Sequence, residues 1–254
     1  MSFNQSVYLN RIQISSPPPP TFDALCQLQK AHLFAIPFEN LDMHYDRPIY
    51  LDLDKIYQKV VLDNRGGFCY ELNGLFYQLL ISLGYQVKMV SGRVYNKKRV
   101  LGQEFDHLAL IVSIDQKEYL CEVGFGAFAI HPLEIKFDIW QQDPSGNYMI
   151  QQGSGEYLSV GVQEKDEVVA SYIFGLKERT FEEFEGMCHY QQTSPDSNFT
   201  NRWVITIPTK EGRITLTNTK LKIEKNGNVE ESDIDSKEMF CTALEKYFGM
   251  SFEY

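Results

Sequence analysis

The chain lacks the features that would carry it into or across a membrane. Its 254 residues contain no run of about 18 apolar residues, which is the length that a transmembrane helix needs. Residues 1–10 also lack a basic stretch followed by an apolar one. We therefore expect neither a transmembrane helix nor a signal peptide.

Positive charge is scarce. Lys and Arg number 24 against 34 Asp and Glu, which gives a formal net charge of −10. Such a surface repels phosphate backbones and anionic lipid headgroups, so nucleic acids and membrane surfaces are not expected as partners. The sequence gives no indication of the oligomeric state.

Cysteine pairs and metal-binding motifs are also missing. There is no CxxC pair and no HExxH helix, and the histidines do not have zinc-ligand spacing, so no metal is expected. An odd number of scattered cysteines is typical of free thiols in a reducing compartment, which predicts a cytoplasmic protein. The cysteines are Cys26, Cys69, Cys121, Cys188 and Cys241.

What is present is a helical first third. Apolar residues recur at helical spacing along one segment: Leu72, Leu75, Phe76, Leu79, Leu80 and Leu83. Gly84 is expected to end this helix, and Cys69 lies at its start, just after the Asp63–Gly67 loop. Two earlier helices are expected, one from the N-cap Thr21 to Ile36 and one over residues 52–61.

From residue 85 the period becomes two, which indicates strands. We expect strands over residues 85–94, 107–114, 118–123, 147–152, 156–162, 168–174, 203–208, 213–218 and 220–224. A capping box at Thr180 predicts a short helix to about Tyr190, and Phe240, Leu244 and Phe248 mark a last one. The pattern predicts an α+β fold of three packed subdomains, over residues 1–84, 85–192 and 193–254: helices first, an antiparallel sheet or small barrel second, and a mixed tail third.

Cys69 is a candidate nucleophile. A free thiol with a pKa of about 8.5 is only a few per cent ionised at neutral pH. The positive end of the helix dipole and the nearby Arg65 would both favour the thiolate. The alternative is that Cys69 is simply a small buried apolar residue.

His107 and Glu122 form a candidate base and carboxylate. If Asp115-Gln116 is a two-residue hairpin turn, His107 faces Gly124, and Glu122 is its diagonal neighbour at about 7 Å. Asp106 is a rival partner, but adjacent strand residues point to opposite faces. The alternative is an ordinary strand histidine and an exposed glutamate.

These residues sit in a recognisable set of motifs. Arg65–Asn73 reads RGGFCYELN, Ile36–Leu41 reads IPFENL, and Val123–Gly126 reads VGFG. Together with His107-Leu108 and Ser194–Phe199, in this order and spacing, the sequence resembles the arylamine N-acetyltransferases.

The resemblance implies that the three subdomains are a helical one, an antiparallel β-barrel and an α/β lid. It also implies a cysteine-protease-like core with a Cys-His-carboxylate triad of Cys69, His107 and Glu122. It implies acetyl-CoA as acyl donor and a ping-pong reaction, in which an arylamine, hydrazine or N-hydroxyarylamine takes the acetyl group from Cys69. It also implies further roles: Arg65 and Glu39 as a structural brace; Phe38, Phe68, Val94 and Phe125 in the acceptor pocket; Gly124, Gly126 and Phe199 near CoA.

Glu122 departs from the family pattern, which has Asp at this position. Glutamate is one methylene longer, so the His107 ring must shift or Glu122 must fold back. Two alternatives therefore stay open beside the acetyltransferase. One is a homologue that binds CoA or arylamines with little turnover, and the other is an amide synthase or amidase with a different acyl donor. The sequence does not indicate the physiological acceptor or the acyl-chain preference.

Overall fold

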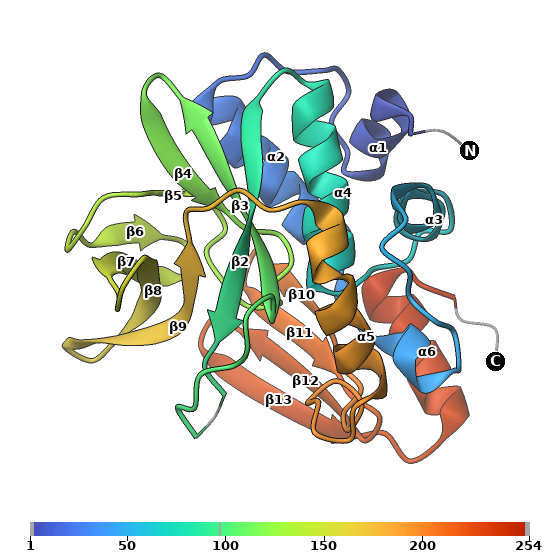
Figure 1. The fold of residues 1–254 in the computed structure, drawn as a ribbon. Coiled ribbons are helices and arrows are strands. Elements are labelled where there is room, and N and C mark those ends of the chain that lie inside the picture. Colours follow the sequence, from blue (N-terminus) through green and yellow to red (C-terminus); the bar gives the residue numbers. More distant parts are fainter. Residues whose placement is uncertain (1–2, 97, 252–254) are drawn as a thin grey trace.

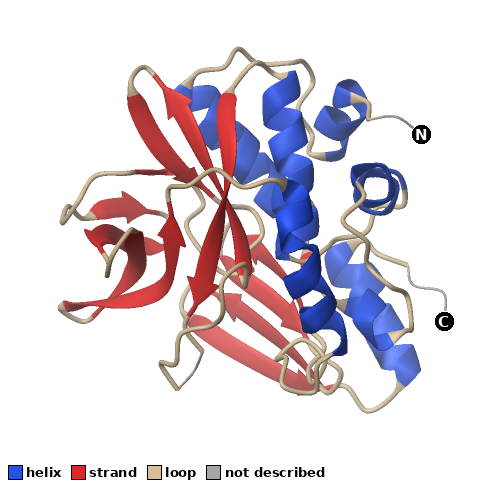
Figure 2. Ribbon diagram, in the orientation of Figure 1, coloured by secondary structure: helices blue, strands red, loops and turns tan. Residues whose placement is uncertain are grey.

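The computed structural model describes residues 3–96 and 98–251. The long helix α4 runs through the centre of the molecule (Figure 1). A strongly curved sheet lies on one side of α4, and a flatter sheet lies below it (Figure 2). The predicted α+β fold, with helices first, a barrel next and an α/β part last, is confirmed.

The N-terminal part is helical. Its helices are α1 (Gln5–Arg11), α2 (Phe22–Ala35), α3 (Leu53–Tyr57) and α4 (Cys69–Ser82), with a 3-10 turn η1 (Leu41–His44). The Thr21 hydroxyl caps α2 by accepting from the Ala24 N–H at 3.3 Å. The helix expected over residues 52–61 continues past α3 as a π turn, η2 (Gln58–Leu62). Helix α1 was not predicted.

The central part is a nearly closed antiparallel barrel. Its strands are β2 (Gln86–Val94), β3 (His107–Ile114), β4 (Lys117–Cys121), β5 (Leu133–Glu134), β6 (Gln141–Asp143), β7 (Gly146–Gln152), β8 (Tyr157–Glu164) and β9 (Glu167–Gly175). Among the described residues they follow the order β5-β4-β3-β2-β9-β8-β7-β6. The two edges meet because the Gln141 side chain bonds both backbone groups of Glu134, each at 2.9 Å.

The C-terminal part forms the second sheet. It contains the turn η3 (Phe181–Phe184), α5 (Glu185–Thr193), β10 (Ile205–Thr209), β11 (Gly212–Leu216), β12 (Lys220–Lys225), β13 (Asn228–Asp233) and α6 (Lys237–Phe248). Strand β13 was not predicted, because every residue in it is exposed and no apolar alternation marks it. The sheet order is β1-β10-β11-β12-β13, so its edge strand β1 (Phe38–Glu39) comes from the N-terminal part.

Strand β3 joins two of the hydrophobic clusters. Leu108, Leu110 and Val112 pack with the helices around α4, whereas Ala109 and Ile111 point into the barrel. Both faces of β3 are therefore buried, which fixes its position beside α4. A third cluster lies between α6 and the lid sheet. The subdomain boundaries after residues 84 and 192 stay a prediction.

Asn40 fastens the N-terminal part to the lid. Its Nδ2 donates to Phe199 O at 2.9 Å and to Arg202 O at 2.8 Å, and its Oδ1 accepts from Val204 N at 2.8 Å. The side chain is fully buried, so these bonds form in a poorly solvated place.

Among the helices of residues 3–96 and 98–251, none has the length and apolar character needed to cross a membrane.

Candidate active site

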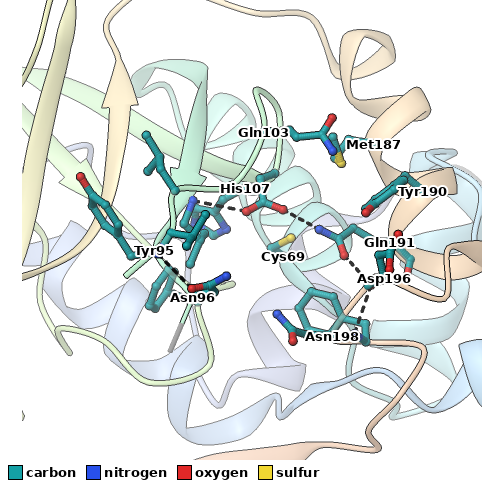
Figure 3. Close-up of a pocket in the computed structure, with 18 of the residues that line it drawn as sticks. Cys69, Tyr95, Asn96, Gln103, His107, Met187, Tyr190, Gln191, Asp196 and Asn198 are labelled. Atoms are coloured by element: carbon teal, nitrogen blue, oxygen red, sulfur yellow. Dashed lines mark hydrogen bonds between the residues drawn. The ribbon is translucent and has the colours of Figure 1, made fainter. Parts of the chain in front are cut away.

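Cys69 opens helix α4. The residue before it, Phe68, is extended, and its N–H donates to Glu71 Oε2 at 3.1 Å, so a carboxylate occupies the positive end of the helix. Cys69 is 4% exposed. It lines a cavity of about 550 Å³ together with His107 (Figure 3).

The hairpin between β3 and β4 has the predicted two-residue turn. Ile114 pairs with Lys117, and Asp115 and Gln116 have φ angles of 48° and 64°, as a type I′ turn requires. The ladder holds this register to Leu110 and Cys121, where β4 ends. Glu122 therefore leaves the sheet close to the beginning of β3.

The hairpin brings His107 and Glu122 together. His107 Nε2 lies 2.6 Å from Glu122 Oε2, and both side chains are buried. The Tyr172 hydroxyl also donates to Oε2, at 3.4 Å. Glu122 Oε1 accepts from Gly124 N at 2.7 Å, so the longer side chain folds back over its own backbone. This fold-back offsets the additional methylene and keeps the carboxylate at the imidazole.

Asn73 is a site residue that the sequence reasoning missed. From the middle of α4 its Nδ2 donates to Glu122 Oε1 at 2.7 Å and to Leu108 O at 2.6 Å. Its Oδ1 accepts from Val123 N at 3.0 Å. Asn73 thus holds Glu122 against the base of β3. The available signal was a polar residue within the apolar stretch of α4, one turn after Cys69.

Asp106 is not the partner of His107, as the strand alternation predicts. Asp106 does not orient His107, because its Oδ1 accepts from Gln191 Nε2 at 2.6 Å and its Oδ2 accepts from Val94 N at 3.3 Å. The Cys121 thiol is buried and donates to Gln29 Oε1 at 2.9 Å.

The expectation that Arg65 favours a Cys69 thiolate is wrong. Arg65 Nη2 instead pairs with Glu39 Oε1 at 2.6 Å and with Asp42 Oδ1 at 3.0 Å. Burial raises the pKa of the Cys69 thiol, and the negative charges of Asp106 and Glu122 raise it further. A backbone hydrogen bond from Leu108 acts in the opposite direction. The thiol is therefore not ionised by its surroundings alone, and Cys69 requires a base that takes its proton.

Arg65 and Glu39 belong to a buried charge cluster. Lys59 Nζ lies 2.7 Å from Asp42 Oδ2 and 2.8 Å from Glu71 Oε1. Burial raises the pKa of Asp42, but Lys59 and Arg65 together hold it below its usual range. Because Glu71 also binds the Phe68 N–H, the cluster is tied directly to the start of α4.

The structure separates the predicted pocket residues into two groups. Those that line the cavity are Phe38, Val94, Gly124, Phe125 and Phe199, beside Cys69 and His107. Phe68 lies one layer behind, fully buried, with its ring 6.2 Å from that of Phe199. Gly126 lies outside the wall, and its carbonyl accepts from Arg213. Tyr95, Asn96, Gln103, Tyr190 and Asn198 also line the cavity and were not predicted (Figure 3).

Substitution of Gly124 by alanine is expected to lower both stability and activity. A Cβ atom there would lie 2.8 Å from Cys69 Cα and 2.8 Å from Asn73 Nδ2. Such overpacking costs about 1–3 kcal/mol and would displace the nucleophile. Urea unfolding and turnover of Gly124→Ala would check this. The exposed Gly186 in α5 has no atom near its Cβ position, so Gly186→Ala is the control. Equal behaviour of the two variants would contradict the close approach.

Comparison with known proteins adds to this geometry. A family model described as N-acetyltransferase matches residues 21–254. An arylamine N-acetyltransferase / N-hydroxyarylamine O-acetyltransferase from Salmonella typhimurium is 30% identical over 247 residues, which cover 96% of this chain and 87% of the relative.

Two similar solved structures bear on the site. An arylamine N-acetyltransferase from Bacillus cereus, described as having a unique Cys-His-Glu catalytic triad, has 26% identity and a TM-score of 0.90 and covers 99% of this chain and 100% of its own. The Mycobacterium marinum arylamine N-acetyltransferase in complex with CoA has 30% identity and a TM-score of 0.89, with coverages of 97% and 93%. The Cys-His-Glu set has the same residue types that Cys69, His107 and Glu122 bring together here.

Proposed function

The chain belongs to the arylamine N-acetyltransferase family, and we propose that it transfers an acetyl group from acetyl-CoA to arylamines and hydrazines through an acetyl-Cys69 intermediate. O-acetylation of N-hydroxyarylamines is included because the Salmonella typhimurium relative carries both activities in its name. The observation that carries the proposal is the 2.6 Å contact between His107 Nε2 and Glu122 Oε2, beside a cavity that contains the Cys69 thiol.

In the first half-reaction the Cys69 sulfur attacks the thioester carbonyl of acetyl-CoA. His107 takes the thiol proton on Nδ1, the ring nitrogen that does not face Glu122. The bond between the acetyl carbon and the CoA sulfur then breaks, and His107 returns the proton to the leaving CoA thiolate. Glu122 fixes the tautomer and stabilises the imidazolium between these two transfers.

In the second half-reaction the acceptor nitrogen attacks the acetyl carbon on Cys69. His107 takes a proton from this nitrogen and passes it to the Cys69 sulfur as the thioester breaks. An amide leaves, and the enzyme returns to its starting state. Because one base serves both halves, donor and acceptor can use the same cavity in turn.

The cavity walls support a planar acceptor. Its volume of about 550 Å³ fits a small molecule, and the rings of Phe38, Phe125 and Phe199 line it. Gly124 and Phe199 line the cavity beside Cys69, where the narrow arm of CoA would reach the thiol, whereas Gly126 lies outside the wall and is not assigned a CoA contact. We assign Phe68 the role of supporting Phe199 from behind.

The five cysteines are free thiols, which supports a reducing compartment such as the cytoplasm.

Intact-protein mass after brief mixing with acetyl-CoA alone tests the proposal. The wild type is expected to gain one acetyl group and to lose it when an arylamine is added. Cys69→Ser is expected to gain no such labile group. The control is Cys26→Ser, which removes a half-buried thiol outside the cavity and should leave the adduct unchanged.

Two other outcomes would replace the proposal. If no adduct forms and Cys69 resists iodoacetamide at neutral pH, the chain binds CoA or arylamines with little turnover. If an adduct forms only with another acyl donor, the chain is an amide synthase or amidase.

A further inference from the structure

We propose that Asp106 sets the charge preference of the acceptor site, so that neutral and cationic arylamines and hydrazines are acetylated in preference to carboxylated arylamines. The inference rests on the proposed function, because it concerns the acceptor of the second half-reaction. Asp106 is a specificity-determining residue in this account and takes no part in the proton transfers.

Asp106 stands in the cavity wall beside the reacting groups. It directly precedes His107 and lines the same cavity as Cys69. Its carboxylate is held from two sides, by Val94 N at 3.3 Å and by Gln191 Nε2 at 2.6 Å. The contact with Gln191 joins the residue before β3 to α5. The carboxylate is thus fixed in the wall and cannot turn away from an acceptor.

The orientation of Gln191 is determined by its own partner. Ser197 Oγ lies 2.6 Å from Gln191 Oε1 and 2.9 Å from the Gln191 carbonyl, and it accepts from Phe199 N at 3.1 Å. Because the amide oxygen of Gln191 faces Ser197, its NH₂ group faces Asp106. The chain of contacts therefore presents a donor to Asp106 without neutralising the carboxylate.

The negative charge of Asp106 persists in the cavity. Val94 and Gln191 are neutral donors, and each carboxylate oxygen can accept further hydrogen bonds. Arg93 lies nearby, but its guanidinium donates to Gly102 O at 2.8 Å. Of the described residues that line the cavity, the charged ones are Asp106, Asp196 and, when protonated, His107. Binding of an amine substrate that carries hydrogen-bond donors or positive charge is therefore favoured, and binding of one that carries a carboxylate is disfavoured.

Burial raises the pKa of the Asp106 carboxyl, whereas the hydrogen bonds from Val94 and Gln191 lower it. Burial outweighs the hydrogen bonds and the net pKa is raised, so the test is run at pH 8 to favour the ionised carboxylate. Two carboxylates about 6 Å apart disfavour binding by about 100-fold at an effective dielectric constant of about 20, and by only about threefold in bulk water. We expect discrimination of about 10- to 100-fold, since the cavity is partly open to solvent.

The test follows acetyl transfer from preformed acetyl-Cys69 to 4-aminobenzoate, 4-aminobenzamide and the permanent cation (4-aminobenzyl)trimethylammonium in single turnovers. Each rate constant is divided by that of the same amine with a free acetyl thioester in solution, which removes differences in nucleophilicity. In the wild type the corrected rates should rise from the anion to the neutral amide to the cation. In Asp106→Asn the ratio of amide to carboxylate should fall by about 10-fold or more. Both rates in this ratio are measured on the same protein, so any effect of the substitution on the reactivity of acetyl-Cys69 cancels.

Three outcomes would overturn the inference. The first is a set of wild-type rates that do not rise from the anionic to the neutral to the cationic acceptor. This result would overturn the inference by itself, even if Asp106→Asn failed to fold. An unchanged ratio in Asp106→Asn would assign the preference elsewhere. If acetyl-Cys69 forms but none of the three amines accepts the group, the proposed arylamine activity itself fails, and the inference fails with it.

Discussion

Replacement of Glu122 by glutamine is expected to lower kcat/KM for acetyl transfer by about 10³- to 10⁴-fold, as for an amide in place of the carboxylate of a catalytic triad. The Glu122 carboxylate lies 2.6 Å from His107 Nε2 and favours the imidazolium that both half-reactions need. A glutamine has no charge to stabilise this cation. If its NH₂ group faced the N–H of His107, two hydrogen-bond donors would oppose one another. Steady-state kinetics across pH 6–9 would measure the loss.

The matched variant is Glu122→Asp, which keeps the charge. The shorter side chain loses its fold-back bond to Gly124 N, so we expect a loss of about 10- to 100-fold from the shifted carboxylate, less than for glutamine. Circular dichroism would verify that both variants fold. Activity of Glu122→Gln within about tenfold of the wild type would remove Glu122 from the mechanism. If Glu122→Asp created turnover where the wild type had none, the native chain would be a binding protein.

Substitution of Arg65 by methionine is expected to lower the free energy of unfolding by about 3–5 kcal/mol, because it leaves three buried carboxylates, Glu39, Asp42 and Glu71, to share the single charge of Lys59. Glu39 is fully buried and lies 2.6 Å from Arg65 Nη2, and Asp42 lies 3.0 Å from the same atom. Urea unfolding measures the change. Because Glu71 links the cluster to the start of α4, the rate of Cys69 alkylation should change as well.

The control for Arg65→Met is Lys117→Met. Lys117 Nζ lies 3.3 Å from Glu134 Oε1, but its side chain is 56% exposed, so its removal should cost no more than about 1 kcal/mol. The double variant Arg65→Met with Glu39→Gln should be less destabilised than the sum of the single variants, since the buried carboxylate that loses the Arg65 guanidinium is then absent as well. Additive effects would show that the pair does not act as a brace.

The site could be predicted where local rules decide the geometry. A two-residue turn at Asp115-Gln116 was assumed between two alternating strands, and the observed turn brings Glu122 back to His107. The start of α4 at Cys69 followed from helical periodicity and the preceding glycines. In these places the governing interactions lie within about twenty residues of one another.

Contacts between distant segments could not be predicted in this way. Asn73 reads as a polar residue in a helix, and its role appears only when β3 and the chain after β4 are packed on α4. Arg65 lies near Cys69 in sequence, yet its guanidinium pairs with carboxylates of β1 and η1, which precede it by 26 and 23 residues. Short strands such as β1 are defined by their partners and have no periodic pattern of their own.

The hydrogen bonds between Asn40 and the lid join segments that the ribosome makes at different times. The partners Phe199, Arg202 and Val204 follow Asn40 by 159, 162 and 164 residues. At about 5–20 residues per second, about 10–30 s separate the emergence of Asn40 from that of these partners. Cys69, His107 and Glu122 all emerge within that interval. The nucleophile and its base are therefore made well before Phe199, which lines the same cavity, so the Cys69 thiol of the nascent chain lacks this part of its enclosure until the lid residues have been made.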